Sequence, residues 1–278
     1  MSKQFRVAVL GATGLVGDTM IKVLEERNFP VSELFPLASN RSLGKSVEFR
    51  GKRHPVLELD KFDFARADIG LFSAGSDTSR EFAPKAWAAG CVVIDNTSEF
   101  RYEDDIPLVV PEVNPQAISG YRTRGIIANP NCSTIQMVVA LKPIHDAVGI
   151  ERINVATYQS VSGAGKEAVD ELASQSAALL SGREAEVKVI AKQIAFNCVP
   201  QIDKFESNGY TREEMKMFWE TCKIMGDDSI RVNATTVRVP VFFGHSEAVH
   251  IETRRKISAG EARALLEKAP GVTVLDDR

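Results

Sequence analysis

The sequence predicts an α/β protein with an N-terminal doubly wound domain and a C-terminal α+β domain. Three observations lead to this prediction. A strand, a glycine-rich turn and a helix open the chain, apolar strands then alternate with helical patterns to about residue 130, and long alternating strands dominate residues 231–253. With 278 residues, the chain has material for two hydrophobic cores. We therefore expect domains over residues 1–130 and 131–278, the second with a mixed, largely antiparallel sheet.

The composition narrows the functional classes. Apolar residues make up 44% of the chain and charged residues 26%, and the net charge of −3 offers no basic surface to nucleic acid. No apolar stretch approaches the roughly 20 residues that span a bilayer, so we expect no membrane insertion. A strand pattern follows almost directly after Met1, which argues against a signal peptide and for a cytoplasmic protein.

The four cysteines are scattered, form no Cys-x-x-Cys pair and have no histidine at ligand spacing. This pattern is typical of reduced thiols rather than of a disulfide framework or a zinc site, so we expect no metal. The cysteines are Cys91, Cys132, Cys198 and Cys222.

The first strand and the turn after it predict a dinucleotide site. Phe5 to Leu10 is an apolar run broken only by Arg6, and Gly11-Ala12-Thr13-Gly14-Leu15-Val16-Gly17 follows, before a helical pattern. Glycines let backbone N–H groups approach a pyrophosphate, and a helix start favours its negative charge. The spacing differs from the commoner Gly-x-Gly-x-x-Gly, so its place after the first strand is what strengthens it. We expect a Rossmann-like domain with cofactor contacts from Gly11, Thr13, Gly14, Leu15 and Val16.

The loop after the second predicted strand, Leu34 to Ala38, indicates which cofactor binds. An NAD site usually places an acidic residue there for the ribose 2′-hydroxyl. This loop has none, and Ser39, Arg41 and Ser42 offer two hydroxyls and a guanidinium, which suit a 2′-phosphate. We therefore expect NADP; a polar surface loop with an ordinary arginine is the alternative.

Two further strand ends carry small polar residues. The run Ile69 to Phe72 leads into Ser73-Ala74-Gly75, and Cys91 to Asp95 leads into Asn96-Thr97-Ser98, with a helix between them that should end at Gly90. An open parallel sheet binds its ligand at the carboxyl ends of its strands. We expect Ser73, Ala74, Gly75 and Asn96 to line the cofactor site, and we interpret Cys91 as a core thiol.

Cys132 is the candidate nucleophile. A short strand, Ile126 to Ala128, is stopped by Asn129-Pro130-Asn131, and a helical pattern begins at Cys132. Asn131 is a natural N-cap, which puts Cys132 in the first helical turn, where the helix dipole should lower the pKa of its thiol. The N–H groups of that turn could also hold an oxyanion. An inert cysteine in a capping turn is equally compatible with this segment alone.

A helix that starts at Thr211 carries two charged candidates. Thr211 and Glu214 form a capping box, and Glu213 and Lys216, three residues apart, share one face. Taken alone, a solvent-exposed ion pair is the simpler interpretation of Glu213 and Lys216.

Three polar side chains in the second half of the chain stand at strand ends. Gln159 leaves a strand into a glycine-rich turn, where a surface glutamine is equally compatible. Residues 231–241 form a long alternating strand that should turn at residues 243–247 into a second one. Arg238 stands before this hairpin turn and His245 within it, so the two could converge on one pocket. Histidine is suited to pass protons near neutral pH.

These segments resemble the aspartate-semialdehyde dehydrogenase family over essentially the whole chain. The motifs are Leu10 to Gly17, Asn129-Pro130-Asn131-Cys132-Ser133-Thr134, Gln159 to Gly165, and Arg238-Val239-Pro240 with Gly244-His245-Ser246-Glu247. Each is unspecific alone, and their combination in this order is highly specific. The resemblance implies that a catalytic and dimerisation domain follows the NADP-binding domain, in a homodimer or homotetramer.

The resemblance implies NADPH-dependent reductive dephosphorylation of L-aspartyl 4-phosphate to L-aspartate 4-semialdehyde and phosphate, on the route to lysine, threonine and methionine. Carried over by position, Cys132 is the nucleophile that forms a thioester, His245 is the general acid and base, and Gln159 orients the acyl intermediate. Ser162 and Gly163 would contact the cofactor. The chemistry is coherent, because an acyl phosphate readily acylates a thiolate and a thioester accepts a hydride.

The resemblance also assigns the substrate groups. Arg238 would bind the α-carboxylate through its bidentate fork, and Glu213 would bind the α-ammonium. Arg101 and Lys216 would hold the phosphate, and Asn131 would belong to the same substrate site. These roles compete with the ion-pair interpretation of Glu213 and Lys216.

Two alternatives stand beside this assignment. N-acetyl-γ-glutamyl-phosphate reductase shares the architecture and the Cys/His chemistry, but the Asn-Cys-Ser-Thr and Gly-His-Ser-Glu segments favour the aspartyl enzyme. A truncated, non-catalytic NADP-binding paralogue is the other, because members of the family usually extend beyond the point where this chain stops. Such a paralogue could lose Cys132 or His245 freely, and both are present.

Overall fold

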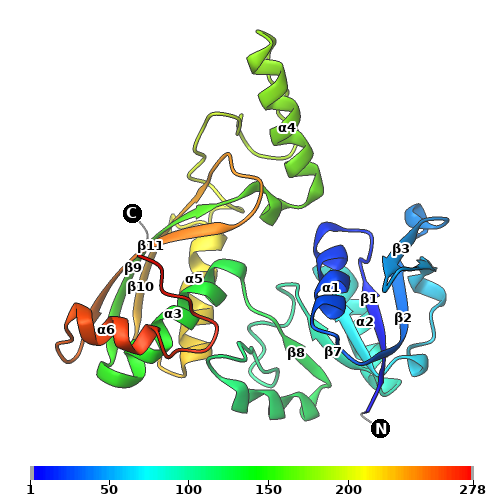
Figure 1. The fold of residues 1–278 in the computed structure, drawn as a ribbon, viewed down its shortest axis with the longest axis horizontal. Coiled ribbons are helices and arrows are strands. Elements are labelled where there is room, and N and C mark those ends of the chain that lie inside the picture. Colours follow the sequence, from blue (N-terminus) through cyan, green and yellow to red (C-terminus); the bar gives the residue numbers. More distant parts are fainter. Residues whose placement is uncertain (1–2, 277–278) are drawn as a thin grey trace. The chain divides into compact units, whose positions relative to one another are not determined.

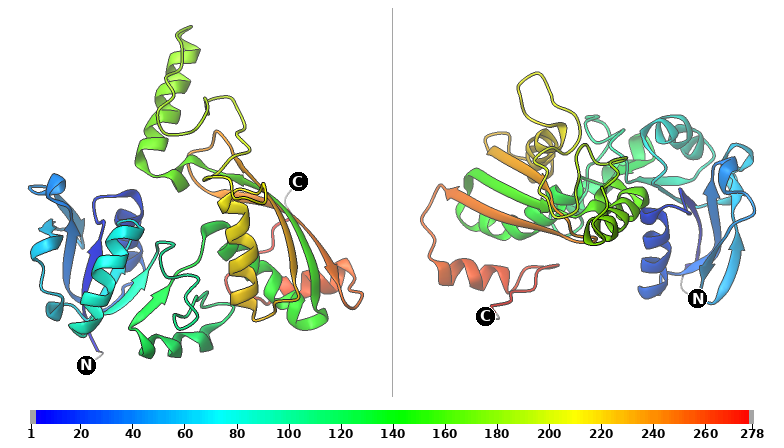
Figure 2. Two further views of the ribbon diagram at one scale, coloured as in Figure 1. Left: turned by 180° about the vertical axis from the view of Figure 1, so that it is seen from behind. Right: turned by 90° about the horizontal axis from the view of Figure 1, so that it is seen from above.

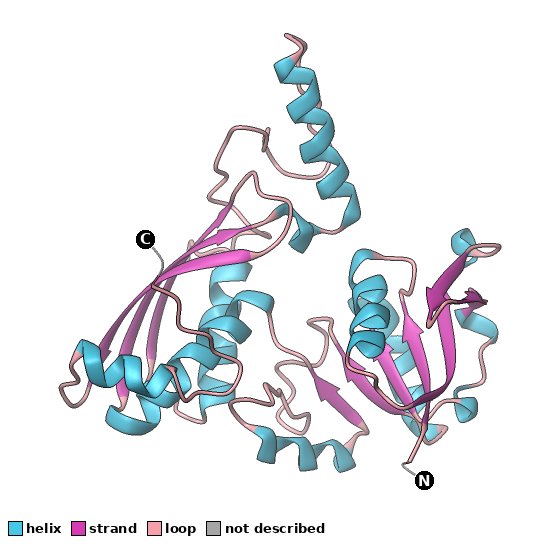
Figure 3. Cartoon of the chain, in the orientation of Figure 1, coloured by secondary structure: helices cyan, strands magenta, loops and turns pink. Residues whose placement is uncertain are grey.

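The computed structural model describes residues 3–276. The chain folds into two compact units (Figure 1). Unit 1 comprises Met1–Val109 and Gln116–Pro130, and unit 2 comprises Val110–Pro115 and Asn131–Arg278. Both units contain helices and strands (Figure 3). The predicted α/β class is confirmed.

Unit 1 is built on a six-stranded parallel sheet in the order β5-β2-β1-β6-β7-β8. The strands are β1 (Phe5–Leu10), β2 (Val31–Ala38), β5 (Leu57–Glu58), β6 (Ile69–Phe72), β7 (Val92–Asp95) and β8 (Ile126–Ala128). Helix α1 (Leu15–Glu26) connects β1 to β2, and α2 (Ser76–Ala88) connects β6 to β7. The chain leaves β1 toward one side of the sheet and later returns to β6 on the other side. Ligands bind at such a switch point, and the predicted Rossmann-like sheet is confirmed.

Smaller elements complete unit 1 and the loops of unit 2. Strands β3 (Ser46–Phe49) and β4 (Lys52–Pro55) form an antiparallel hairpin. The 3-10 helices are η1 (Asn40–Ser42), η2 (Leu59–Lys61), η3 (Phe64–Arg66), η4 (Pro115–Thr123) and η5 (Val161–Ala164).

Strand β1 is an apolar run, broken only by Arg6, and it lies in the middle of the sheet. Val7 and Leu10 are at most 1% exposed, and β1 packs with Ile21 of α1 and Leu34 of β2 in one core cluster. Parallel strands that are covered on both faces consist of near-continuous apolar residues. The first strand could therefore be predicted with its observed bounds, whereas β2 begins at Val31, before its apolar run.

Gly11 and Gly17 give the turn after β1 its shape. Gly11 has a φ of +78°, the left-handed region that favours glycine, and its carbonyl oxygen accepts the N–H of Gly14 at 2.9 Å. A Cβ on Gly17 would lie only 2.2 Å from the carbonyl oxygen of Gly11. Gly14 is the N-cap of α1 and provides no side-chain cap. Helix starts of this kind bind anions through their backbone N–H groups.

Unit 2 holds a three-stranded sheet in the order β10-β9-β11 (Figure 2). Strand β9 (Ile150–Gln159) lies in the middle, β10 (Arg231–Arg238) pairs with it in parallel, and β11 (His245–Thr253) pairs with it antiparallel. The helices of this unit are α3 (Cys132–Val148), α4 (Lys166–Leu180), α5 (Arg212–Met225) and α6 (Ala259–Leu266). The prediction of a mixed sheet is confirmed, but among the described strands one pairing is parallel and one antiparallel, so this sheet is not largely antiparallel.

The predicted hairpin of residues 231–253 is wrong. Strands β10 and β11 follow each other in the chain, but β9 lies between them. Pro240 has no N–H to continue β10, and the connection passes the end of β9, where the N–H of Val161 donates to the carbonyl oxygen of Val241 at 2.9 Å. An alternating pattern shows which face of a strand is buried, but it does not show which strand lies beside it.

The sheet of unit 2 packs its inward face against α3 and α5 through an apolar core. Ile153 and Val155 of β9 and Ala234 of β10 pack there with Met137 of α3 and Met217 of α5. These side chains alternate along the strands, as expected for a sheet with one covered face. The core fixes the position of the two helices on the sheet.

The inward face becomes polar toward the end of β9. Thr157 follows the apolar rows and is fully buried. The last row holds Arg238, Gln159 and His245, because both Arg238 and His245 are paired in register with Gln159. The sheet thus brings together three side chains that are distant in the sequence.

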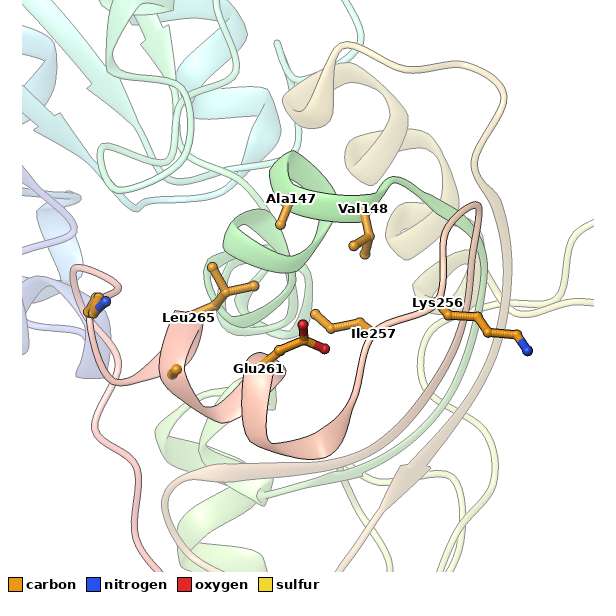
Figure 4. A pocket seen from close by; sticks show the side chains of 8 residues that line it. Ala147, Val148, Lys256, Ile257, Glu261 and Leu265 are labelled. Carbon is orange, nitrogen blue, oxygen red and sulfur yellow. The ribbon is translucent and has the colours of Figure 1, made fainter.

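Helix α3 continues past Pro143 to Val148, so the proline does not end the helix. A cavity of about 310 Å³ lies between this end of α3 and α6 (Figure 4). Val148, Ile257 and Leu265 give it an apolar lining, and no predicted site residue lines it. Among residues 3–276, no helix is long and apolar enough to cross a membrane, and no group of three or more His, Cys, Asp or Glu could hold a metal ion.

Gly17→Ala should destabilise the protein, because the new Cβ would collide with the carbonyl oxygen of Gly11. We expect the free energy of unfolding to fall by about 1–3 kcal/mol, the usual effect of overpacking, in urea denaturation. Gly260→Ala in α6 is the matched control, since its Cβ would meet no atom within 4 Å. Alanine favours a helix, so this variant should gain up to about 1 kcal/mol. Equal stability of Gly17→Ala and wild type would contradict the close approach.

Candidate active site

Asn131 caps the helix that carries Cys132. Its Oδ1 accepts the backbone N–H groups of Ser133 at 3.0 Å and Thr134 at 3.2 Å, and its own backbone is extended. The predicted N-cap and the place of Cys132 in the first turn are therefore confirmed. Asn131 already occupies these two N–H groups, so an oxyanion would have to displace it there or bind the N–H of Cys132, and the expected oxyanion site stays a prediction.

The sulfur of Cys132 lies next to the imidazole of His245. The distance between Sγ and Nε2 is 3.3 Å, within reach of a hydrogen bond to sulfur. His245 opens β11 and is paired with Gln159 of β9. Nδ1 of the same ring lies 3.1 Å from the backbone N and 3.2 Å from Oγ of Ser160, so Ser160 holds the imidazole from its other side and can bond either tautomer. Unit 2 alone thus brings a nucleophile and a base together.

The expectation that the helix start lowers the pKa of Cys132 is wrong. Burial raises the pKa of the thiol above its ordinary value, and the negative charge of Glu213 raises it further. The N–H of Ser133 and the charge of Arg238 act in the opposite direction and do not outweigh these effects. Although protein atoms crowd the sulfur, the side chain of Cys132 is exposed enough for a reagent to reach it. Cys132 is therefore an accessible, neutral thiol at neutral pH.

His245 is the complementary partner of Cys132. Burial lowers the pKa of its imidazole and the positive charge of Arg238 lowers it further, against the opposing effects of the Gly244 carbonyl and the Glu213 carboxylate. The ring is therefore neutral near pH 7 and can accept a proton. A neutral thiol beside a neutral imidazole favours proton transfer during attack over a preformed ion pair.

Glu213 is the centre of a buried hydrogen-bond network. Its Oε1 accepts from Nδ2 of Asn131 at 2.9 Å and from Nε2 of Gln159 at 3.0 Å, and its Oε2 accepts from Nζ of Lys216 at 3.1 Å. Burial would raise the pKa of this carboxyl, but the Lys216 charge and the hydrogen bonds from Gln159 and Asn131 hold it below its ordinary value. Both side chains of the Glu213–Lys216 pair are largely buried, so the interpretation as a solvent-exposed pair is wrong.

Lys216 is held by two carboxylates. Its Nζ donates to Oδ2 of Asp203 at 2.9 Å as well as to Glu213. Burial would lower the pKa of the amine, but the two carboxylates raise it, so Lys216 remains charged. Asp203 has a φ of +67°, which is uncommon for a residue with a side chain. No motif surrounds Asp203, and sequence reasoning missed it.

Gln159 connects the start of α3 to α5. Its Nε2 donates to Oγ of Ser133 and to Glu213. The side chain is 1% exposed, so the alternative of a surface glutamine is wrong. Its Oε1 is buried and has no hydrogen-bond partner among the residues that the structure describes. An unsatisfied buried acceptor costs about 1–3 kcal/mol, which a donor on a bound ligand would offset.

Arg238 lies at the same end of the sheet and is buried. Its Nη1 donates to the carbonyl oxygen of Ser160 at 2.6 Å. A Cβ on Gly163 would lie 3.0 Å from this Nη1 and 3.6 Å from Nε2 of His245. The missing side chain of Gly163 therefore leaves room for both functional groups. Burial lowers the pKa of Arg238, but a guanidinium remains charged at neutral pH.

In unit 1, the predicted cofactor residues lie at the carboxyl ends of its strands. Oγ1 of Thr13 and Oγ of Ser42 are 3.1 Å apart, which joins the glycine turn to η1. Oγ of Ser73 donates to the carbonyl oxygen of Leu10 at 2.8 Å. Gly75 has a φ of +96° and is the N-cap of α2. These contacts shape the edge of the sheet where a dinucleotide would bind.

The end of β7 holds two further predicted residues, Asn96 and Arg101. Oδ1 of Asn96 accepts from Nδ2 of Asn129 at 2.5 Å. The buried guanidinium of Arg101 donates to the carbonyl oxygens of Asn96 and Thr97, each at 3.0 Å. Asp95, which sequence reasoning missed, is fully buried and accepts the N–H and the hydroxyl of Thr97. Arg101 thus belongs to unit 1, whereas the other predicted substrate residues belong to unit 2.

Besides Asp203, three residues of the site in unit 2 were missed because they act through neighbouring residues. Ser133 accepts from Gln159, Ser160 holds the ring of His245, and Glu220 of α5 accepts the backbone N–H of Asn131 at 2.6 Å. The two serines stand directly beside predicted residues in the sequence, which is a usable signal. Glu220 has no such signal.

Comparisons with known proteins agree with this geometry. A model of the semialdehyde dehydrogenase NAD binding domain matches residues 6–121, and a model of the semialdehyde dehydrogenase dimerisation domain matches residues 141–278. An aspartate-semialdehyde dehydrogenase of Legionella pneumophila is 66% identical over 277 residues, which cover 100% of this chain and 80% of the relative. One from Aquifex aeolicus is 56% identical over 275 residues, covering 98% and 81%.

Solved structures are similar in fold as well. The crystal structure of aspartate semialdehyde dehydrogenase II complexed with ASA from Vibrio cholerae has a TM-score of 0.96 and 64% identity, and the match covers 97% of this chain and 80% of that chain. The aspartate semialdehyde dehydrogenase with NADP from Candida albicans has a TM-score of 0.70 and 26% identity, with coverage of 96% and 76%. These relatives do not favour a reductase of N-acetyl-γ-glutamyl phosphate or a non-catalytic paralogue.

Alkylation of Cys132 by iodoacetamide should still be accelerating as the pH rises above neutral, because the pKa of its thiol is raised. Glu213→Gln removes a charge that raises this pKa, so its profile should shift to lower pH. Mass spectrometry of the peptide that contains Cys132 measures both rates, with the exposed Cys198 as an internal reference in the same sample. A wild-type rate that is already maximal below neutral pH would contradict the raised pKa.

Proposed function

The chain belongs to the aspartate-semialdehyde dehydrogenase family, and we propose that Cys132 and His245 carry out the chemistry of that family in it. The reaction is the NADPH-dependent conversion of L-aspartyl 4-phosphate to L-aspartate 4-semialdehyde and phosphate, which would supply lysine, threonine and methionine synthesis. The observation that supports these roles most directly is the 3.3 Å between Sγ and Nε2, with the sulfur accessible to solvent. Nucleophile and base are then within direct proton-transfer distance.

In the first step, Sγ of Cys132 attacks the acyl carbon while Nε2 of His245 takes the thiol proton. This requires the tautomer of the neutral ring that carries its own proton on Nδ1, where Oγ of Ser160 can accept it. The bond from that carbon to the phosphate oxygen breaks, phosphate leaves, and a thioester on Cys132 remains. Gln159 lies beside the start of α3, and its amide would orient the acyl oxygen. This split of the reaction gives each half a good leaving group.

In the second step, His245 handles the proton that it gained. NADPH, when bound, would supply the hydride that reduces the thioester. The protonated ring of His245 donates its proton to the oxygen of the reduced carbon, and it accepts that hydroxyl proton again when the C–S bond breaks. The aldehyde leaves, and the proton returns from His245 to the sulfur of Cys132. The reaction thus begins and ends with a neutral Cys132 thiol and a neutral His245 imidazole, as in the free protein.

The charges of the buried network complement the substrate. Arg238 is the candidate for the α-carboxylate and Glu213 for the α-ammonium, while Lys216 and Arg101 are the candidates for the phosphate. Glu213 is ionised and Lys216 is charged, since each supports the other in the folded protein. Asn131 would act on the substrate site through its bond to Glu213.

The chain offers a site that fits NADP. The left-handed Gly11 and the helix start without a side-chain cap at Gly14 suit a pyrophosphate. Ser39, Ser42 and the exposed Arg41 suit a 2′-phosphate, and Ser162 and Gly163 would contact the cofactor from unit 2.

The outer face of the unit 2 sheet suits an assembly of two or four copies. Tyr158 of β9 points away from the core and is 47% exposed, and Ala156 and Ala248 lie on the same outer face. Large exposed aromatic side chains are common in subunit interfaces. We therefore propose a homodimer or homotetramer, which sedimentation equilibrium would show as a multiple of the 30.4 kDa chain. The scattered cysteines, a pattern typical of reduced thiols, support a cytoplasmic location.

Phosphate-dependent reduction of NADP with aspartate semialdehyde should be measurable with this chain. Cys132→Ala should lower kcat by at least about 10⁴-fold, because the covalent route is lost. The increase in absorbance of NADPH measures the rate. Cys198→Ala is the matched control, since Cys198 is exposed and has no place in the mechanism, and it should retain full activity. Activity in Cys132→Ala would contradict the role of the nucleophile.

Arg41→Ala tests the choice of cofactor. The loss of its guanidinium should raise KM for NADP by about tenfold or more and should leave KM for NAD unchanged, because only NADP carries the 2′-phosphate. Initial rates with each cofactor give both constants. An equal effect on NADP and NAD would show that Arg41 does not bind the 2′-phosphate.

A further inference from the structure

Glu220 is a fully buried carboxylate beside the start of the cysteine helix. It is 0% exposed, and its Oε2 accepts the backbone N–H of Asn131 at 2.6 Å. A charged group is costly to bury, so a carboxylate in this place must make strong hydrogen bonds. The contact joins α5 to the residue that directly precedes Cys132.

This contact replaces half of a capping box. In a capping box, the N-cap side chain accepts the N–H of the third helical residue, and a Glu or Gln at that third position accepts the N-cap N–H. Helices α5 and α6 have complete capping boxes, in which the side chains of Glu214 and Glu261 accept the backbone N–H of the N-cap residue. In α3 the third residue is Thr134, whose N–H is capped by Asn131 but whose side chain is not a carboxylate. Glu220, from helix α5, instead supplies the carboxylate that accepts the N–H of Asn131.

We propose that Glu220 is a positioning residue that holds Asn131, and through it Cys132, in place while substrate binds. The proposal rests on the proposed role of Glu213. Asn131 is held from α5 twice: Glu213 binds its side-chain amide and Glu220 binds its backbone N–H. The two glutamates are seven residues apart and so lie on one face of α5, two turns from each other.

The two contacts respond differently to substrate. When the α-ammonium binds Glu213, that carboxylate must share or give up its bonds to Asn131 and Gln159. Glu220 has no group of the substrate to bind, so its bond to the Asn131 N–H persists. The N-cap then stays in place at the moment when Cys132 attacks.

Loss of this anchor should change the chemistry of Cys132. If Asn131 shifts, the turn that presents the N–H of Ser133 to the sulfur loosens, and that N–H lowers the pKa of Cys132. The distance between Sγ of Cys132 and Nε2 of His245 would also become variable. A small misplacement of a reacting group can cost about a hundredfold in rate.

Three substitutions of Glu220 separate position from charge. Glu220→Ala removes the acceptor, Glu220→Asp keeps the charge but shortens the reach, and Glu220→Gln keeps an acceptor oxygen without the charge. In the full chain, the Ala and Asp variants should shift the pH profile of Cys132 alkylation upward and lower kcat by about 10- to 100-fold, with KM changed less than about threefold. The Gln variant should keep the wild-type profile and a kcat within about threefold.

Glu214→Ala is the matched control. It removes a capping-box carboxylate from the same helix without touching Asn131, so it should lower stability and leave the alkylation profile of Cys132 unchanged. If Glu220→Ala does not fold, the alkylation profiles and kcat values of Glu220→Asp and Glu220→Gln are compared instead, and they test the proposal. A wild-type profile and kcat in Glu220→Ala or Glu220→Asp, or an equal loss in Glu220→Gln, would overturn the proposal.

Alkylation needs no turnover, so the two proposals fail in distinguishable ways. An inactive wild type with a shifted profile in Glu220→Asp would refute the proposed reaction and support the anchor. An active wild type with unshifted profiles in the Ala and Asp variants would support the reaction and refute the anchor.

Discussion

The hydrogen bonds around Asn131 are the constraint on which the site in unit 2 depends. Its side chain caps α3 and so determines where Cys132 stands, while Glu213 and Glu220 hold its amide and its backbone N–H from α5. With its own carbonyl oxygen bonded within α3, every polar group of this residue has a partner. A buried residue whose polar groups are all bonded in this way is held in one arrangement. The sheet then places His245, at the start of β11, beside the sulfur of Cys132.

The same network explains why the reacting pair is neutral in the free protein. The Glu213 carboxylate adds to the effect of burial in raising the pKa of Cys132, and Arg238 adds to burial in lowering the pKa of His245. A neutral thiol is less nucleophilic and less easily oxidised than a thiolate. Binding of a substrate ammonium would compensate the charge of Glu213, so the substrate itself would favour ionisation of Cys132.

The features that were predictable from the sequence are those with local causes. Strand β1 and its glycine turn follow from an apolar run and from backbone sterics, and the N-cap at Asn131 follows from residues two and three positions away. The resemblance to a family assigned the roles within the site. Three features depend on contacts distant in the sequence: the place of β9 between β10 and β11, the burial of Glu213 with Lys216, and the direction of the pKa shift at Cys132. No local pattern contains them.

A thioester on Cys132 is the central claim, and it can be observed directly. The protein is mixed with L-aspartyl 4-phosphate in the absence of NADPH, quenched in acid and digested, and the peptide that contains Cys132 is analysed by mass spectrometry. We expect an aspartyl adduct on Cys132, with one phosphate released for each adduct formed. Phosphate release with Cys132 unmodified, or an adduct on a different residue, would contradict the mechanism.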